Sequence, residues 1–506
     1  MGIEPAVCVA FPRPGIAGRV LAIVDRSIAT HLIKQAHFSR KMAQVTLPGA
    51  CAIPYYVMLL SLLATFATAA APAASKRLVE RHRADAAVAQ LRTRVSVTLP
   101  RQGAPDLLQA VTTMPDLSSN TNEAIALLDG FAERTGLITQ SRPQRYLWND
   151  AFAVCTWLGL ARTSGDPRFR DLALRLVDQV HQTLGRHRDD DPRRGWISGL
   201  GERDGAIHPT RGGLRIGKAL PERGEHEPFD HQLEWERDGQ YFHYLSKWMY
   251  ALDQLSRSVR EPRFNTWARE LVLAAHDAFT YRPARSPTPR MHWKMSIDLS
   301  RPLVGSMGQH DALEGYLAAM QLRATAASLS PAPGGPDLDT AARDFSAMVG
   351  RAELATADPL GIGGLLADAY RIAQLVQQKS MPENGLLEAL LGAARTGLEV
   401  FARSGELQSP AAHRLAFREL GLAIGLEAAQ RLSTDAEHGR VELSGSARAE
   451  LTTLLGYAPL GDEIEAFWRR GDNRRAAGWT EHRDINEVML ATRLAPDGFL
   501  VVVPLD

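Results

Sequence analysis

The feature that most constrains the fold of this chain is an alternation of two kinds of helical segment. After the helix-start signal Asp166-Pro167, apolar residues from 169 to 184 recur at helical spacing along one face only. Residues 242–255, by contrast, are apolar on nearly every side, as are 151–160, 360–369 and 415–426. A helix with one apolar stripe lies at an outer surface, whereas a helix that is apolar all round is buried all round. The alternation therefore predicts two concentric layers of helices.

The two kinds of segment alternate strictly from residue 121 to the end of the chain. One-faced segments are expected to begin near Thr121, Asp166, Glu261, Asp337, Glu383 and Ser446, and buried segments near Asn149, Asp238, Gly308, Pro359, Ala411 and Arg483. Strand signals are nearly absent before a short apolar stretch at 498–503. The pattern predicts an all-α domain over residues 121–506, with almost no sheet.

Six outer helices alternating with six inner helices resemble the six-hairpin, or (α/α)6, toroid. That fold occurs in many glycoside hydrolases and in some polysaccharide lyases and sugar epimerases. The resemblance rests on helix order over residues 121–506, and no catalytic residue is carried over by a motif. It implies a substrate pocket at the mouth of the ring, where the inner helices begin.

The N-terminal part of the chain has a different character. No charged residue occurs between Lys41 and Lys76, and an apolar run covers residues 50–74. The basic flank, apolar core and small residues are typical of a signal peptide, but the length also suits a membrane-spanning helix. Residues 1–75 are therefore expected to be a cleaved leader, a membrane anchor or an extension upstream of the true start, and 76–120 a linker with a short helix. An exported or membrane-anchored location follows, and a cytoplasmic one stays open.

Composition narrows the classes of function and partner. The formal net charge is +1, which argues against a nucleic-acid binder that works by bulk electrostatics. The three cysteines, Cys8, Cys51 and Cys155, include no closely spaced pair, and the histidines follow no zinc motif. We expect no cofactor and no metal. The expected ligand is an oligosaccharide or another small polar molecule, with membrane association open through residues 50–74.

Carboxylates near the starts of the inner helices are the catalytic candidates. Glycoside hydrolysis needs two carboxyl groups beside the scissile bond, one of them protonated near neutral pH. Asp238 lies between Trp235 and Tyr241 and is the preferred acid; the further candidates are Asp150 and Asp484 as the base, and Asp311. The competing interpretation is that Asp150, Asp238 and Asp484 only cap helix N-termini, and that Asp311 forms a structural pair with His310.

Substrate-binding candidates lie beside these acids and in the long insertion at 187–237. Glycines and cations in the insertion favour an anionic ligand group, although the same cations could pair with Glu222, Glu225 and Glu227 in a solvated loop. The full set of binding candidates is Trp148, Trp196, Arg211, Arg215, Lys218, Trp235, Gln240, Tyr241, His243, Gln309, His310, Arg418 and His482.

Three functions are compatible with these residues. The first is a glycoside hydrolase that uses paired carboxylates. The second is a sugar epimerase or polysaccharide lyase, in which His243, His310 or His482 is the base and Arg211 or Arg215 holds a uronate carboxylate. The third is a non-catalytic helical scaffold or glycan-binding protein.

Overall fold

The computed structural model describes residues 118–350 and 352–504, and this part of the chain is predominantly helical. Its helices follow the order expected from the sequence. Six of them, called the inner helices, are α5 (Leu147–Ser164), α9 (Phe242–Val259), α11 (Asp311–Ser328), α13 (Pro359–Gln377), α15 (Ala416–Glu437) and α19 (Arg483–Leu494). Six others, called the outer helices, are α4 (Ser119–Arg134), α6 (Pro167–Leu184), α10 (Pro262–Phe279), α12 (Asp339–Val349), α14 (Leu386–Ser404) and α16 (Gly445–Leu455). The predictions for residues 1–117 lie outside the described residues.

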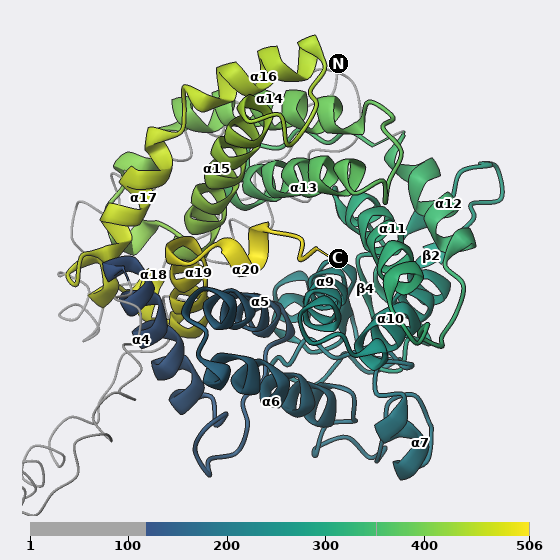
Figure 1. The fold of residues 1–506 in the computed structure, drawn as a ribbon. Helices are drawn as coiled ribbons and strands as arrows, with labels where there is room; N and C mark the ends of the chain where they lie inside the picture. The colour runs from purple at the N-terminus through teal and green to yellow at the C-terminus, as the bar shows by residue number, and fades with distance from the viewer. Residues whose placement is uncertain (1–117, 351, 505–506) are drawn as a thin grey trace, which may run out of the picture. The chain divides into compact units, whose positions relative to one another are not determined.

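The inner helices contact one another in sequence order. α5 packs against α9, α9 against α11, α11 against α13, α13 against α15 and α15 against α19, and α19 packs against α5 in turn (Figure 1). Each outer helix packs behind one inner helix: α4 on α19, α6 on α5, α10 on α9, α12 on α11, α14 on α13 and α16 on α15. The inner helices supply much of the buried apolar core, as their all-round apolar sequences predict.

Local signals explain why the outer helices begin where they do. The side chain of Asp166 accepts a hydrogen bond of 2.8 Å from the backbone N–H of Arg168, and Pro167 occupies the first turn. Pro262 plays the same role after Glu261 in α10. Because proline cannot donate a backbone hydrogen bond, it fits the first turn of a helix, where no partner is needed. The two helix starts predicted from these dipeptides are confirmed.

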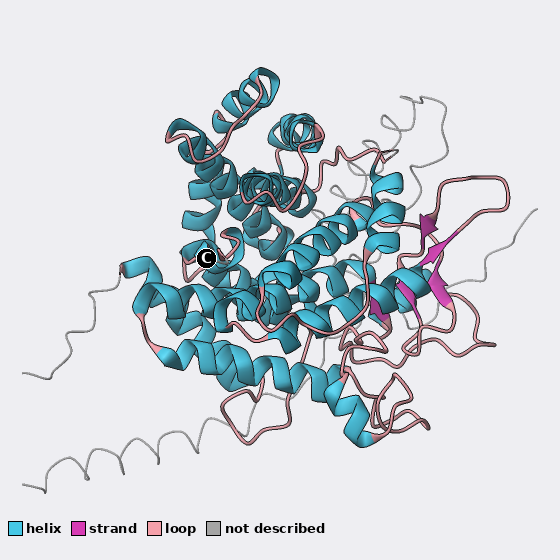
Figure 2. Ribbon diagram, turned by 45° about the vertical axis from the view of Figure 1, so that its right-hand side comes forward, coloured by secondary structure: helices cyan, strands magenta, loops and turns pink. Residues whose placement is uncertain are grey.

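Short elements fill the connections between the paired helices. The additional helices are α7 (Glu202–Ile207), α8 (His231–Glu236), α17 (Pro459–Arg469), α18 (Ala477–Thr480) and α20 (Asp497–Leu500), with 3-10 turns η2 (Glu406–Gln408), η3 (Ala411–His413) and η4 (Asn473–Arg475). The strands are β1 (Gln240–Tyr241), β2 (Thr280–Tyr281), β3 (Arg290–Met291), β4 (Lys294–Met295) and β5 (Pro302–Val304). They form a sheet of order β1-β4-β5 and a β2-β3 pair, both antiparallel, at one edge of the helical body (Figure 2).

Three predictions about element boundaries are wrong. The fifth inner helix begins at Ala416 and not near Ala411, because residues 411–413 form the 3-10 turn η3. The second inner helix begins at Phe242 and not near Asp238, because Gln240 and Tyr241 pair with Met295 and Lys294 of β4. The apolar stretch at 498–503 is no strand: residues 497–500 form α20. Side chains of the inner helices bond its backbone in place of a neighbouring strand.

The C-terminal segment 497–503 lies among the inner helices (Figure 1). Gln254 of α9 donates to the carbonyls of residues 498 and 501, at 3.1 and 2.7 Å. Gln374 of α13 donates to the carbonyl of residue 500 at 2.9 Å and accepts from the N–H of residue 502 at 2.9 Å. Tyr250 donates to the carbonyl of Phe499 at 2.7 Å. These bonds satisfy backbone groups that are otherwise buried without a ladder.

Within residues 118–350 and 352–504, no helix combines the length and the apolar character that crossing a membrane requires.

Candidate functional site

Aromatic and imidazole side chains lie together at the starts of four inner helices, α5, α9, α15 and α19. We call this group the rim: Tyr146, Trp148, His243, Tyr244, Phe417 and His482. The hydroxyls of Tyr146 and Tyr244 are 2.7 Å apart, and the Trp148 indole donates to Nε2 of His243 at 3.2 Å. The centre of the Phe417 ring lies 6.2 Å from the ring centre of Trp148 and 6.1 Å from that of His482. The structure thus brings Trp148, His243 and His482 together.

His243 connects the rim to a charged layer beneath it. Its Nδ1 is 3.0 Å from the carboxylate of Glu314, while its Nε2 accepts the Trp148 N–H. An Nε2 that accepts a hydrogen bond carries no proton, so Nδ1 is the donor to Glu314. Both ring nitrogens are therefore occupied. This arrangement orients Glu314 and disfavours His243 as the base of an epimerase or lyase.

Glu314 is held by three donors from α9. Besides His243, Lys247 donates to Oε1 at 2.9 Å, and the Ser246 hydroxyl donates to Oε2. Burial alone would raise the pKa of Glu314, but the interactions with His243 and Lys247 and the hydrogen bond from Ser246 bring it well below its ordinary value. Burial opposes the charge of Lys247, yet its pKa is raised because Glu314 is adjacent. Both groups are charged near neutral pH.

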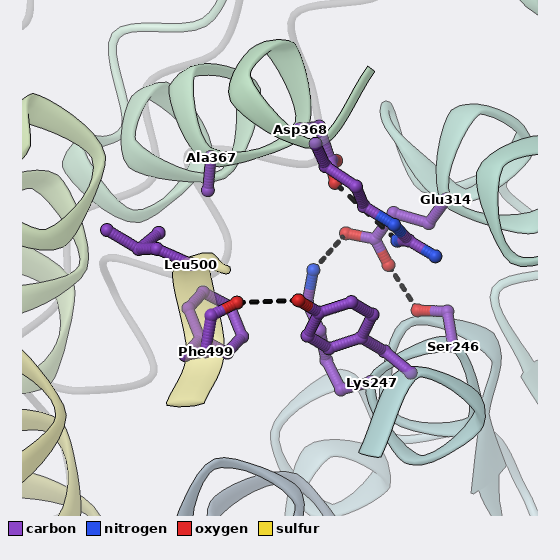
Figure 3. Close-up of a pocket in the computed structure, with 9 residues that line it drawn as sticks. Ser246, Lys247, Glu314, Ala367, Asp368, Phe499 and Leu500 are labelled. Atoms are coloured by element: carbon purple, nitrogen blue, oxygen red, sulfur yellow. Dashed lines mark hydrogen bonds and ion pairs between the residues drawn. The ribbon is translucent and has the colours of Figure 1, made fainter. Parts of the chain in front are cut away.

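A small cavity borders this charged layer (Figure 3). Its volume is about 20 Å³, room for one water molecule or a group of similar size. The cavity is lined by Ser246, Lys247, Tyr250, Glu314, Ala367, Asp368, Arg371, Phe499 and Leu500. Three inner helices supply its polar groups, and the C-terminal segment supplies Phe499 and Leu500. The segment therefore forms one apolar wall of the cavity.

Asp368 brings a second carboxyl group to the cavity. Its nearest cation is Arg371, whose Nη1 is 3.9 Å from Oδ1, and within the described part of the chain no hydrogen bond reaches its side chain. Burial raises the pKa of Asp368, and the negative charge of Glu314 adds to the effect against the opposing charge of Lys247. The cavity thus combines an ionised carboxylate, Glu314, with a carboxyl group whose pKa is raised.

The sequence analysis missed Lys247, Glu314, Asp368 and Arg371. A signal for two of them was present: Lys247 and Asp368 are charged residues inside the segments 242–255 and 360–369, which are otherwise apolar on nearly every side. A charge on such a helix must be buried, and a buried charge needs a partner. The acids selected from the sequence lie at helix starts, about one turn or more before the residues of the cavity.

Asp238 is not placed at the rim. It is fully buried, and its carboxylate is 2.5 Å from Nη1 of Arg215 and 3.4 Å from Nη1 of Arg188. It also accepts from the backbone N–H of Gly217 at 3.0 Å. Two guanidinium groups and a backbone N–H thus occupy the carboxylate, and it has no open face toward a substrate. The geometry argues against its expected role as general acid, and it also caps no helix.

The cations of the glycine-rich loop do not converge on a ligand site. Arg215 forms an ion pair with Asp238, and the Lys218 ammonium donates to the carbonyl of Trp235. The guanidinium of Arg211 lies 3.8 Å from the carboxylate of Glu270 on α10. Nor do these cations pair with Glu222, Glu225 or Glu227: the structure pairs Glu222 with Arg193 and Glu227 with Arg237 instead. Both interpretations of this loop from sequence are therefore replaced by one in which its cations hold the loop to the domain.

Gln240 explains why this loop contains glycine. Its side-chain amide donates to the carbonyls of Gly212 and Ile297 at 3.0 and 2.7 Å and accepts from the N–H of Leu214 at 2.8 Å. Gly213 has a φ of +76°, and a Cβ there would lie 2.0 Å from Oε1 of Gln240. The glycine serves backbone packing around Gln240, not the approach of a ligand.

The other acids expected near the mouth have separate environments. Asp150 is fully buried, accepts from the N–H of Tyr146 at 3.1 Å and lies 3.6 Å from Arg145; burial raises its pKa to about 6. Asp311 accepts from the N–H of Gly308 at 3.2 Å, and burial, then the charge of Glu314, raises its pKa to about 7. Asp484 is paired with Arg134 of α4 at 2.8 Å. Asp150 and Asp311 thus each bond the backbone just before their own helix without capping a first-turn N–H, and Asp484 joins two helices.

The remaining binding candidates are placed as follows. The ring centres of Trp235 and Tyr241 are 6.1 Å apart, and the ammonium groups of Lys218 and Lys294 lie over the Tyr241 ring. His310 lies 2.8 Å from the carbonyl of Leu354 through Nε2. The others are Trp196, buried against Arg186; Gln309, bonded to the carbonyls of residues 353 and 355; and Arg418, 2.8 Å from Asp358. Trp196 and Gln309 do not reach the rim.

No model of a known protein family matches this chain, and a search of curated proteins finds no match. Among the described residues, no group of three or more His, Cys, Asp or Glu side chains is arranged to hold a metal ion. The argument for function therefore depends on the rim and the cavity alone.

Proposed function

We propose that this chain is a carbohydrate-active enzyme built on an (α/α)6 toroid, with the rim as its sugar-binding mouth. The circuit of contacts through the six inner helices, each backed by one outer helix, supports the toroid. The aromatic face of half-buried Phe417 suits the apolar face of a sugar ring, and the hydroxyls of Tyr146 and Tyr244 suit its hydroxyl groups. The ligand is then an oligosaccharide.

The observation that carries the proposal is the pair of carboxyl groups at the cavity. Asp368 is buried, has no hydrogen-bond partner among the described residues and has a raised pKa, so it is suited to protonate the oxygen of a leaving sugar. Glu314 is ionised and oriented by His243, Lys247 and Ser246, so it is suited to stabilise positive charge that develops on the sugar ring. An acid and an ionised carboxylate are the pair that glycoside hydrolysis requires.

A histidine base is less well supported. His243 has both ring nitrogens engaged, and His310 shares its Nε2 with the carbonyl of Leu354. Burial lowers the pKa of His482, which favours its neutral form, but the structure gives it no carboxylate or carbonyl partner to orient the ring. An oriented ring is what a histidine base needs for efficient proton transfer. The hydrolase proposal therefore ranks above the epimerase or lyase.

The test compares carboxyl variants on a panel of neutral and uronate-containing oligosaccharides. Asp368→Asn and Glu314→Gln keep the side-chain shape, and each should lower release of new reducing ends by about a hundredfold or more. Asp344→Asn is the matched control. Asp344 lies on outer helix α12, away from the cavity, and is paired with His276 and Arg282. Its turnover should match that of the wild type.

Two results would overturn this proposal. One is a folded Asp368→Asn variant with wild-type turnover. The other is a wild-type protein that binds panel sugars saturably but never cleaves them, which is the outcome expected of a glycan-binding protein. Melting curves recorded beside the activity assays distinguish a lost catalytic group from a lost fold.

A further inference from the structure

We propose that Arg371 forms an anion subsite in the wall of the cavity, and that it receives the carboxylate of an acidic sugar. This inference rests on the proposed function and specifies its substrate class: a uronate whose carboxylate enters the cavity. It assigns the anion to α13, and not to the loop cations Arg211, Arg215 and Lys218.

Arg371 is nine-tenths buried, yet its guanidinium is only partly used. Its Nε donates to Oε1 of Gln321 at 2.5 Å, and its guanidinium carbon lies 4.6 Å from the centre of the Tyr250 ring. These two contacts fix the plane of the group. Within the described residues, its two terminal nitrogens make no hydrogen bond, and the nearest acid, Asp368, is 3.9 Å away. A buried guanidinium in this state has donors available for a planar, two-oxygen acceptor.

The neighbouring charges favour an anion over a cation. The carboxylate of Glu314 is already matched by Lys247 and by two further donors, so it offers little to a cation. Burial and the charge of Glu314 raise the pKa of Asp368, against the charges of Lys247 and Arg371. Asp368 is the one ion-pair partner of Arg371 among the described residues, and at 3.9 Å it makes no hydrogen bond to the guanidinium. Lys247, which lines the same space and uses one of its three donors on Glu314, adds to the attraction.

The size of the cavity limits what enters it. A volume of about 20 Å³ holds a water molecule or a carboxylate-sized group but not a sugar ring. The apolar side of the cavity, formed by Ala367, Phe499 and Leu500, excludes water from the ion pair and so strengthens it. A carboxylate satisfies both limits, because it is small enough for this space and carries the charge that Arg371 and Lys247 attract.

The experiment measures binding, so it does not depend on turnover. Calorimetric titration compares galacturonate with galactose and glucuronate with glucose, on the wild type, on Arg371→Lys and on Arg431→Lys. Arg431 is a control on inner helix α15, paired with Glu427 and Asp497. The wild type should bind the acidic sugars at least about tenfold more tightly, the magnitude of one charge-assisted hydrogen bond. Arg371→Lys keeps the charge but loses the planar fork, so it should lose most of that preference and keep its affinity for neutral sugars.

The outcomes separate this inference from the proposed function. Equal binding of acidic and neutral sugars by the wild type overturns the anion subsite and leaves the proposed function standing. Binding of acetate that Arg371→Lys abolishes, with no sugar bound at all, retains the subsite and overturns the carbohydrate function. An acid preference that survives Arg371→Lys overturns the role of Arg371, and absence of any binding overturns both. Should Arg371→Lys fail to fold, the comparison of paired sugars on the wild type still decides.

Discussion

Asp311 makes the stability of this protein depend on pH. It is buried at the start of α11, where burial and the charge of Glu314 raise its pKa from an ordinary 3.8 to about 7. Between these two values the folded protein holds a proton that the unfolded chain releases. The free energy of unfolding must then fall as the pH rises through this interval. Asp150, with a pKa raised to about 6, contributes in the same direction over a narrower interval.

We expect Asp311→Asn to weaken this dependence. The amide cannot ionise and keeps an oxygen for the N–H of Gly308, so the cost of charging a buried carboxyl disappears at alkaline pH. Urea unfolding at about pH 5 and pH 8 should show a smaller loss of stability in the variant than in the wild type, with a residual loss from Asp150. Asp171→Asn, at an exposed position of α6, is the control and should behave as the wild type. Equal pH dependence in Asp311→Asn and the wild type would contradict the assignment.

At the scale of single residues, the sequence predicted which residues are buried better than it predicted which residues contact one another. Asp238 was selected for the aromatic residues beside it in the chain, but its environment is set by Arg215 and Arg188, 23 and 50 residues upstream. Such partners depend on how the insertion folds back, which no local pattern encodes. Trp148 and His243 were found because both lie in the first turns of inner helices, where the helix order alone brings them together.

At the scale of elements, the contact between α13 and α15 depends on glycine. A Cβ at Gly363 would lie 2.1 Å from the carbonyl oxygen of Gly421, and one at Gly425 would lie 2.4 Å from Cα of Gly363. The two backbones therefore touch, which only hydrogen in place of a side chain permits. Within the segment 361–364, Gly363 has this packing role. The sequence shows that this residue is small but not which helix it faces.

We expect Gly363→Ala to be strongly destabilising and the adjacent Gly364→Ala to be harmless. The first methyl group collides with backbone, which cannot move aside as a flexible side chain can, so a loss of about 1–3 kcal/mol or more is expected. A Cβ at Gly364 meets nothing within 4 Å, and alanine favours a helix interior over glycine by roughly 1 kcal/mol. Thermal melting of both variants makes the comparison. A Gly363→Ala protein as stable as Gly364→Ala would show that the helices are not in backbone contact.

The boundaries of elements were predictable where a local signal fixes them. Asp166-Pro167 and Glu261-Pro262 gave the starts of α6 and α10 because capping and proline act within one turn. The start of α9 was misplaced because pairing of Gln240 with Met295, 55 residues away, competes with the helix. The segment 498–503 was misread for a related reason: Gln254 and Gln374 satisfy its backbone, so it needs no neighbouring strand.

At the scale of the whole described body, α19 joins the two ends of the helical series. It packs against α4 and α5 at the beginning of the described chain and against α15 near its end. The pairing of Arg134 with Asp484 and Glu487 spans about 350 residues of sequence at the same junction. Because the two ends share this helix, loss of α19 exposes buried faces on both sides at once. The helical series should therefore unfold as one cooperative unit.

Leu490→Ala tests this cooperativity. Leu490 is fully buried on α19, so its truncation should cost about 2–5 kcal/mol through lost burial and the cavity that remains. Leu273→Ala, at a partly exposed position of α10, is the control and should cost less than about 1 kcal/mol. Hydrogen exchange distinguishes a local from a shared effect: in Leu490→Ala the slowest amides of α4, α5 and α15 should lose protection by the same free energy. Loss confined to α19 and α4, with α5 and α15 still protected, would mean that the two ends of the series unfold independently.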